Sequence, residues 1–483
     1  MGERLFVISD LHLGGEPGFQ MVLPSGQARL AAFIRRVTSQ HSRDRAAHLV
    51  LAGDIVDFLS EAPFAAFTAD DGEATRKLGR ILSDTAVIWD ALCAHVQAGA
   101  PLTVMLGNHD IELSLPGPRR LLMNRLSRGA VDFLDDDRAF TRGPLLVEHG
   151  NRYDGWNVVD HDGLRQLRAA ASRREAVRGP VIQPGSEMVA TLMNPLKQKY
   201  SFIDLLKPET ETVPPLLALL EPALLSDLRH IYDVARLARR AGQARTSRDL
   251  DGLDAPPDAA AVRSAKMLAL TEDLAAPTAE VGSPAEDPAQ ASALGRSRGF
   301  SELLDFASMW ISARFSADRG TPLLRKLRTA LLAHAGSATV AMHTGFEQDS
   351  YLDAAREAAG RGFQVVIFGH THLVKRIDLG GSLYLNTGTW ADLMSLPKHT
   401  LDLAADESLA LRELAEFADD LASNRLDRYR SSFSTFACID LTDDLHLAGA
   451  DVLRFTDQGE SEAIPDGVLR LDQLLSERRE NGT

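Results

Sequence analysis

Histidine, aspartate and asparagine residues gather in five short clusters, and each cluster follows an apolar run. The clusters are Asp10 and His12 in SDLH, Asp54 and Asp57 in GDIVD, Asn108, His109 and Asp110 in GNHD, His149 in EHGN, and His370 and His372 in GHTH. Imidazoles, carboxylates and one amide form a mixed nitrogen and oxygen ligand set, which suits Mn, Fe, Zn or Co better than Ca or Mg alone. The clusters contain no cysteine, which argues against a structural zinc site or an iron–sulfur cluster. The residue types therefore predict a centre for divalent metal ions.

The apolar runs in front of the clusters predict buried strands. These runs are Leu5 to Ile8, His48 to Ala52, Leu102 to Leu106, Leu145 to Val147 and Val365 to Phe368. A sixth run, Thr339 to Met342, stands before His343 and also predicts a strand. The spacing of apolar residues also predicts helices at Gln27 to Thr38, Arg76 to Gln97 and Leu401 to Leu426. Alternating strands and helices indicate an α/β layered domain. Because loops converge at the strand ends of open α/β sheets, the five clusters can meet at one point.

Three glycines stand directly before polar residues of the clusters: Gly53, Gly107 and Gly369. A residue without a Cβ atom lets the backbone turn sharply and approach a metal ion or a phosphate closely. We therefore expect tightly packed loops at these three clusters.

Taken in chain order, the clusters are similar to the motifs of the calcineurin-like metallophosphoesterase superfamily: D-x-H, G-D-x-x-D, G-N-H-D, a lone H-G and G-H-T-H. The resemblance covers roughly residues 4–150 and 338–456. It implies an α/β fold, the metallo-dependent phosphatase four-layer α/β/β/α sandwich, here with a large helical insertion. It also implies two divalent metal ions, with Mn²⁺ expected first and Fe, Zn or Co as alternatives.

By the resemblance, each metal ion has its own ligands and one carboxylate is shared. The implied ligands are Asp10, His12 and His372 for the first ion, Asn108, His149 and His370 for the second, and Asp54 for both. Two divalent cations about 3.5–4 Å apart can share a bridging hydroxide and hold the oxygens of a phosphoryl group for in-line attack. The expected activity is metal-dependent hydrolysis of phosphate esters or anhydrides, by a phosphodiesterase, pyrophosphohydrolase or phosphatase.

Residues beside the implied ligands also have expected roles. His109 is expected to protonate the leaving oxygen or to stabilise the equatorial charge, and Asp110 to orient His109. Asp57 is expected to hold a metal-ligating imidazole through its free N–H. The sequence NTGTW, from Asn386 to Trp390, resembles a turn that shapes the site from behind in relatives.

The lone histidine has a competitor, because His343 in VAMHTG also follows an expected strand. We favour His149, which follows a strand, precedes a glycine and stands before the helical insertion. This order resembles the bacterial UDP-2,3-diacylglucosamine pyrophosphohydrolases, although those enzymes typically carry arginine at the position of His109. Arg152 is a candidate substrate-binding residue, because a guanidinium group can bind phosphate through two hydrogen bonds.

The resemblance and the composition together divide the chain into parts. Residues 1–150 and 336–460 are the expected metallophosphoesterase core, residues 151–335 a helical cap and residues 461–483 a C-terminal tail. Within the cap, residues from about 249 to 298 are rich in Ala, Pro, Asp, Glu, Gly and Ser. Such a stretch cannot bury enough apolar surface to offset its chain entropy, so we expect a flexible linker there. The cap is expected to lie over the metals and to set the choice of substrate.

The composition narrows the classes of function. The chain has 483 residues, of which 45% are hydrophobic, and it has two cysteines. A globular protein of a reducing compartment is therefore expected rather than a disulfide scaffold. The first residues lack a signal-peptide pattern and no apolar stretch is long enough to span a membrane, so we expect a cytoplasmic protein.

The expected partner is a phosphate-containing small molecule or a lipid-linked substrate, and the oligomeric state is left open. The formal net charge of −15 disfavours nucleic acid as the partner, because phosphate contacts need a basic field. Two alternatives remain: a metal-dependent nuclease, and a scaffold of the same fold that has lost catalysis.

Overall fold

The structure is a computed structural model that describes residues 2–126, 131–173, 175, 179–206, 216, 237, 240 and 321–469. The helices and strands in chain order, with η marking short 3₁₀ or π helices, are β1 (Gly2–Ile8), α1 (Pro24–Ser39), β2 (Arg45–Ala52), η1 (Phe58–Ser60), α2 (Asp71–Asp84), α3 (Ala86–Gln97), β3 (Leu102–Met105), η2 (Ile111–Ser114), α4 (Pro116–Arg125), β4 (Val131–Leu134), β5 (Phe140–Arg142), β6 (Leu145–Val147), η3 (Asn151–Tyr153), α5 (His161–Arg173), α6 (Pro184–Met188), η4 (Val189–Met193), α7 (Asn194–Lys197), α13 (Thr321–Met342), α14 (Asp349–Gly360), β7 (Val365–Phe368), β8 (Lys375–Asp378), β9 (Leu383–Asn386), β10 (Asp392–Met394), α15 (Glu407–Ala422), β11 (Arg430–Ser432), β12 (Thr435–Leu441), β13 (Leu447–Phe455) and β14 (Ser461–Ala463). The linker predicted at about 249–298 and most of the predicted tail lie outside the described residues.

Two mixed sheets lie in the first of two compact units, which comprises Met1–Asn194, Thr344–Asp392 and Ser432–Gly467. The larger sheet has seven strands in the order β14-β13-β12-β1-β2-β3-β4, and the smaller has five in the order β5-β6-β7-β9-β8. Strands β1 to β4 run parallel, and so do β6, β7 and β9. Within each sheet, the parallel strands therefore deliver the loops that follow them to the same edge.

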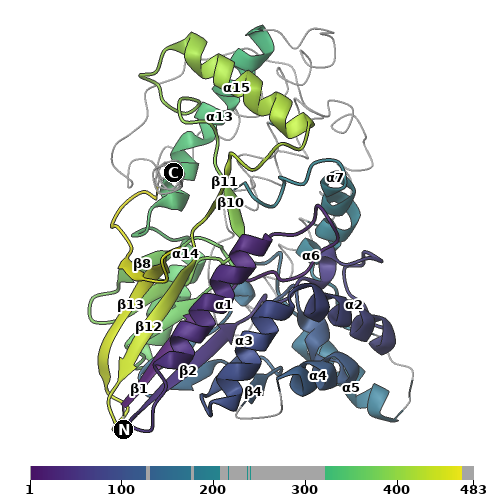
Figure 1. The fold of residues 1–483 in the computed structure, drawn as a ribbon, viewed down its shortest axis with the longest axis vertical. Helices are drawn as coiled ribbons and strands as arrows, with labels where there is room; N and C mark the ends of the chain where they lie inside the picture. The colour runs from purple at the N-terminus through teal and green to yellow at the C-terminus, as the bar shows by residue number, and fades with distance from the viewer. Residues whose placement is uncertain are drawn as a thin grey trace. The chain divides into compact units, whose positions relative to one another are not determined.

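Helices cover the outer face of the larger sheet. Helix α1 buries Leu30, Phe33, Ile34 and Val37, which recur at the spacing of one helix face. These side chains share one core with residues of α2, α3, α4 and with Phe6 of β1 (Figure 1). The apolar stripes predicted from the sequence are therefore the faces that hold the helices on the sheet.

The smaller sheet has its own covering helix and shares an apolar layer with the larger one. Helix α14 packs Tyr351 and Ala355 against Val366 and Phe368 of β7. The intervening residues of β7 and β1, which include Val365, Ile367, Leu5 and Val7, are buried as well. Because side chains alternate between the two faces of a strand, these residues fill the space between the sheets. This arrangement is the predicted four-layer α/β/β/α sandwich.

The second unit comprises Pro195–His343, Leu393–Ser431 and Val468–Thr483. Its described elements include α13, which buries Leu327 and Leu331, and α15, which buries Leu414 and Phe417. This division differs from the predicted boundaries, since residues 151–194 group with the core unit and residues 393–431 with the second.

Among the described helices, none combines the length and the apolar character that a membrane span requires.

Three predicted elements need correction. The strand predicted at Thr339 to Met342 is wrong, because these residues form the last turn of α13. The β-branched pair Thr339 and Val340 stands among alanines, and a helix that is already formed extends more easily than a new strand begins. The single helix predicted at Arg76 to Gln97 is two helices that meet at Thr85, whose backbone is not helical. The tail predicted from residue 461 begins with β14, which pairs with β13.

Candidate metal centre

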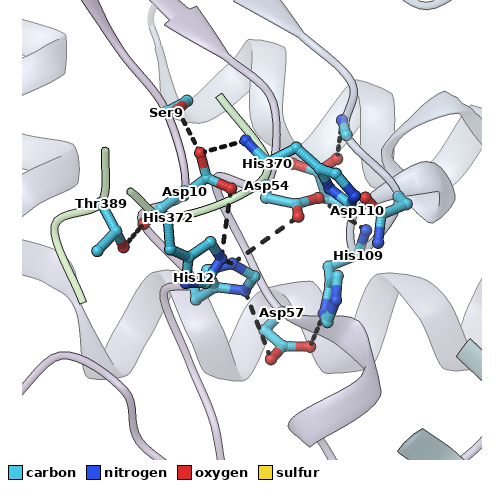
Figure 2. Close-up of polar contacts among 12 residues, drawn as sticks. Ser9, Asp10, His12, Asp54, Asp57, His109, Asp110, His370, His372 and Thr389 are labelled. Atoms are coloured by element: carbon cyan, nitrogen blue, oxygen red, sulfur yellow. Dashed lines mark hydrogen bonds and ion pairs between the residues drawn. The ribbon is translucent and has the colours of Figure 1, made fainter. Parts of the chain in front are cut away.

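The side chains predicted to hold metal ions lie together in the first unit, on loops that leave five parallel strands. Asp10 and His12 follow β1, Asp54 follows β2, Asn108 follows β3, and His149 and His370 follow β6 and β7. Three groups of possible ligands each have their donor atoms within 4.8 Å of one another: Asp10, His12 and His372; Asp54, His149 and His370; and His12, Asp57 and His109, which shares His12 with the first group (Figure 2). The tertiary structure thus brings together residues up to 362 positions apart in the chain.

Several of these side chains stand on strained backbone. Asp10, His12, Asp54, His370 and His372 all have positive φ angles, between 43° and 70°. This left-handed conformation costs about 1–2 kcal/mol for each residue that has a Cβ atom, although aspartate and histidine tolerate it better than most. Such strain persists only where the surroundings enforce it, and it concentrates at functional sites.

Backbone hydrogen bonds hold the first two loops against each other. The amides of Leu11 and His12 both donate to the carbonyl oxygen of Asp54, each at 2.9 Å. The amide of Asp10 donates to the carbonyl oxygen of Gly53 at 3.1 Å. These bonds hold the two loops together and place Asp10, His12 and Asp54 at the same site.

The three glycines that precede the clusters permit close approach, as predicted. A Cβ atom at Gly107 would lie 2.1 Å from Asp54 Oδ1, and one at Gly369 would lie 2.2 Å from Ser9 Oγ. Gly53 has a φ of +90°, and a Cβ atom there would lie 2.7 Å from the ring of His149. No larger residue fits at these positions without displacing a side chain of the site.

Replacing Gly53 by alanine is expected to lower the free energy of unfolding by about 3 kcal/mol, because a backbone penalty of about 1 kcal/mol adds to the cost of overpacking. Gly362→Ala is the matched control. Gly362 has a φ of +101°, but a Cβ atom there would meet nothing within 4 Å. It should cost only the backbone penalty, about 1 kcal/mol. Urea unfolding followed by circular dichroism measures both, and equal losses would contradict the predicted clash with His149.

The first group of possible ligands consists of Asp10, His12 and His372. The Nε2 atoms of His12 and His372 lie 2.9 Å apart, and His372 Nε2 lies 3.4 Å from Asp10 Oδ1. The other carboxylate oxygen of Asp10 accepts hydrogen bonds from Ser9 Oγ and from the amide of His370, the latter at 2.9 Å. Asp10 Oδ1 is buried and has no hydrogen-bond partner among the described residues. This leaves Oδ1 as the oxygen aimed at the two imidazoles.

The second group forms around Asp54 and His149. His149 Nδ1 donates to the carbonyl oxygen of Ala52 at 2.9 Å, which leaves Nε2 as the nitrogen that faces the site. That nitrogen lies 3.2 Å from Asp54 Oδ2 and 3.3 Å from Asn108 Oδ1. The ring of His370 lies 5.3 Å from the ring of His149, measured between centroids. His149, predicted as the lone histidine, therefore lies beside the residues predicted to share a metal ion with it.

The buried charges of this group reinforce one another. Burial alone would raise the pKa of Asp54, but the nearby charges of His149, His109 and His12 outweigh it and hold that pKa well below its usual range. Burial would lower the pKa of His149, but the charge of Asp54 prevails and raises it to about 9. The charge of Asp54 thus favours a positive charge at Nε2 of His149.

These contacts fit divalent metal ions. A neutral His149 with its proton on Nδ1 has a lone pair on Nε2, and this nitrogen faces Asp54 Oδ2 and Asn108 Oδ1. Three acceptor atoms this close together need a cation between them. The unpartnered Oδ1 of Asp10 beside two imidazole nitrogens indicates the same for the first group. Metal binding requires neutral imidazoles, so a divalent ion would replace the proton that the site now draws in.

The third group places Asp57 and His109 beside the first. Asp57 Oδ1 lies 3.3 Å from His109 Nδ1, and Asp57 Oδ2 lies 3.8 Å from His12 Nδ1. Burial would raise the pKa of Asp57, but the charges of His109 and His12 hold it well below its usual range. Asp57 thus lies beside His12 Nδ1 but beyond hydrogen-bond distance of it, and the role of Asp57 beside a metal-ligating imidazole stays a prediction.

The orienting contact predicted for Asp110 is made by Asp57 instead. Asp110 is fully buried, and its two oxygens accept from the backbone amides of Gly107 and Ile55, each at 2.7 Å. Burial, together with the charge of Asp54, raises the pKa of Asp110 to about 7 despite these two donors. Asp110 therefore joins the second and third loops through their backbones, and the side chain that faces His109 belongs to Asp57.

Two other predicted residues lie elsewhere. His343 directly follows α13 in the second unit, where it forms an isolated bridge with Val468, and it is in none of the three groups. The strand that was expected before it is a helix, so the pattern that made it a competitor is absent. Arg152 lies in η3, with its guanidinium 3.3 Å from Glu148 and over the ring of Tyr153. Its charge is therefore already paired within the first unit.

The side chains that support the ligands come from the predicted NTGTW turn and from Asp154, which the sequence analysis did not single out. Thr389 Oγ1 donates to the carbonyl oxygen of Asp10 at 2.8 Å, and Asn386 Nδ2 donates to that of Gly369 at 2.9 Å, so the NTGTW turn does support the loops from behind. Asp154 Oδ2 lies 3.2 Å from His370 Nε2. The only signal for Asp154 was its place in the loop that begins with His149, where carboxylates are also common without a function.

The fold and these buried groups define an α/β/β/α domain with a candidate metal centre at the ends of its parallel strands. Residues 3–178 match the family model of the calcineurin-like phosphoesterases, so this part of the chain is similar to that family and the resemblance in the motifs is confirmed. A search of the curated proteins found no match. The family indicates metal-dependent hydrolysis of phosphate esters and a phosphate-containing substrate. The narrower likeness to the UDP-2,3-diacylglucosamine pyrophosphohydrolases stays a prediction.

Proposed function

We propose that this chain is a hydrolase of phosphate esters or anhydrides that works with two metal ions at one site. The observation that carries the proposal is the position of Asp54. Its Oδ2 atom lies 3.2 Å from Nε2 of His149 on one side and 3.8 Å from Nε2 of His12 on the other. A carboxylate oxygen that faces ligand groups on both sides suits two neighbouring cations.

The residues would share the ions as the motifs predict. Asp10, His12 and His372 would hold the first ion, Asn108, His149 and His370 the second, and Asp54 both. Two divalent cations bound there would lower the pKa of a water molecule shared between them and would neutralise charge on the phosphoryl oxygens. The mixed nitrogen and oxygen donors favour Mn²⁺, Fe, Zn or Co over Ca or Mg.

His109 would act on the leaving group. Asp57 accepts a hydrogen bond from its Nδ1–H, which leaves Nε2 as the nitrogen that can exchange a proton with a leaving oxygen. The ring lies edge-on to that of His12, with the centroids 4.8 Å apart, so it is next to the proposed first ion. A protein nucleophile is not needed, because water attacks the phosphorus.

Hydrolysis by metal-depleted protein re-supplied with Mn²⁺ tests the proposal without assuming the natural substrate. Bis-p-nitrophenyl phosphate reports diester cleavage and p-nitrophenyl phosphate reports monoester cleavage, and both release a coloured product. We expect Mn²⁺ to raise the rate on at least one of them by about 100-fold or more, because the proposed ions supply several kcal/mol of the barrier reduction. Full occupancy by Mn²⁺ without turnover of either ester would contradict the proposed activity and favour the scaffold alternative.

A further inference from the structure

A chain of four polar side chains runs behind the second group of ligands. Asp154 Oδ2 lies 3.2 Å from His370 Nε2 and accepts a hydrogen bond from Asn157 Nδ2 at 2.7 Å. Asn157 Oδ1 in turn accepts from Asn108 Nδ2 at 3.4 Å. The chain therefore begins at His370 and ends at Asn108, the two residues that flank His149 in the proposed second metal site.

The loop that carries Asp154 and Asn157 is itself held in place. The amides of Trp156 and Asn157 donate to Asp154, to its Oδ1 atom at 2.9 Å and to its carbonyl oxygen at 3.0 Å. Asn151 Nδ2 donates to the carbonyl oxygen of Asn157 at 2.8 Å. A Cβ atom at Gly185, at the start of α6, would lie 2.2 Å from Asn157 Oδ1, so only glycine leaves room for this amide. The loop is thus a built support rather than a chance contact.

The hydrogen-bond directions along the chain follow from its chemistry. An ionised carboxylate only accepts, so the proton between Asp154 and His370 belongs to Nε2 of His370. The neutral imidazole then carries its lone pair on Nδ1. Asn157 Oδ1 likewise only accepts, so it selects the NH₂ group of Asn108 and leaves the amide oxygen of Asn108 facing His149 Nε2, at 3.3 Å.

We propose that Asp154 and Asn157 are positioning residues for the second metal ion: Asp154 holds His370 in the tautomer that offers Nδ1 to the ion, and Asn157 turns the amide oxygen of Asn108 toward it. The inference rests on the proposed dinuclear site. Supporting residues of this kind typically change metal affinity by about 10–100-fold when they are removed. The first ion has different supports, so its affinity should stay unchanged.

Asp154→Asn tests the inference with little change in shape. The carboxylate accepts hydrogen bonds on both oxygens, and an amide cannot, so one of the contacts with Trp156 and His370 is lost in either orientation of the amide. Titration calorimetry of the metal-depleted protein with Mn²⁺ should show two sites in the wild type and one site weakened by about 10–100-fold in the variant. Asn157→Ala should weaken the same site.

Asp162→Asn is the matched control, because Asp162 is exposed on α5 and pairs only with Arg165 among the described residues. It should leave both Mn²⁺ affinities unchanged. Nitrogen-15 spectra of the histidines in the Zn²⁺-loaded protein give a second readout, with the signals of His370 assigned by their loss in His370→Gln. We expect a proton on Nε2 in the wild type and a loss of this pattern in Asp154→Asn.

The outcomes separate the two proposals. Two unchanged Mn²⁺ affinities in Asp154→Asn, or a proton on Nδ1 of His370 in the wild type, would overturn the positioning role and leave the hydrolase proposal standing. Fewer than two Mn²⁺ ions bound by the wild type would contradict the dinuclear site and the positioning role with it. The melting temperatures of metal-depleted Asp154→Asn and metal-depleted wild type are compared as a control. Equal values show that a weakened site in the variant is not caused by misfolding.

Discussion

Asp54→Asn is expected to lower the Mn²⁺-dependent rate on bis-p-nitrophenyl phosphate by about 10³-fold or more. Asp54 is the carboxylate that faces both proposed ions, and its other oxygen accepts from the backbone amide of His109 at 2.8 Å. Asparagine keeps the shape and can keep the contact with His109, but it has no charge to bind two cations. Losing about 4 kcal/mol of transition-state stabilisation corresponds to about a 10³-fold change in rate.

Asp84→Asn provides the control for this experiment, since it makes the same substitution at an exposed position at the end of α2. It should leave the rate unchanged. Mn²⁺ content, measured on the same samples, is expected to fall in Asp54→Asn because a shared ligand is lost. A rate within about tenfold of the wild type, with two Mn²⁺ ions still bound, would show that Asp54 does not bridge the ions.

His149→Ala is expected to lose one of two bound Mn²⁺ ions and to lower the diesterase rate by about 100-fold or more, whereas His343→Ala should retain both ions and the wild-type rate. The nitrogen of His149 that faces the site is 3.2 Å from Asp54 and 3.3 Å from Asn108. His343 directly follows α13 and takes part in none of the groups of possible ligands. Each variant therefore serves as the matched control of the other.

Metal content by elemental analysis, measured with the rate, decides between the two histidines. If His343→Ala lost an ion while His149→Ala kept two, the ligand assignment would be reversed. A wild-type metal content in both variants would leave Asn108 and His370 as the ligands specific to the second ion, and the lone histidine would then not be a ligand.

Much of the fold was predictable because the strands before the polar clusters are short, are buried where they end, and stop abruptly at polar residues. β6 and β7 begin and end at the predicted residues, Leu145–Val147 and Val365–Phe368. Burial on both faces requires an unbroken apolar run, and a polar cluster that follows it marks the end of the strand. The run at Thr339 to Met342 carried the same local signal, but its helix begins at Thr321 and continues through it. The local preference of four residues is too small to resist such an extension.

The sequence by itself determined the composition of the candidate site: the order of the motifs named the side chains that the structure brings together, from Asp10 to His372. Only the tertiary structure decided which of them touch. Asp57 rather than Asp110 faces His109, and Asp154, which no motif marked, closes a hydrogen-bonded chain behind His370. Spacing along a chain fixes which loop a side chain occupies, but its direction depends on left-handed turns and on hydrogen bonds between loops that are distant in sequence. Those contacts exist only once strands distant in the chain have paired and the two sheets have packed.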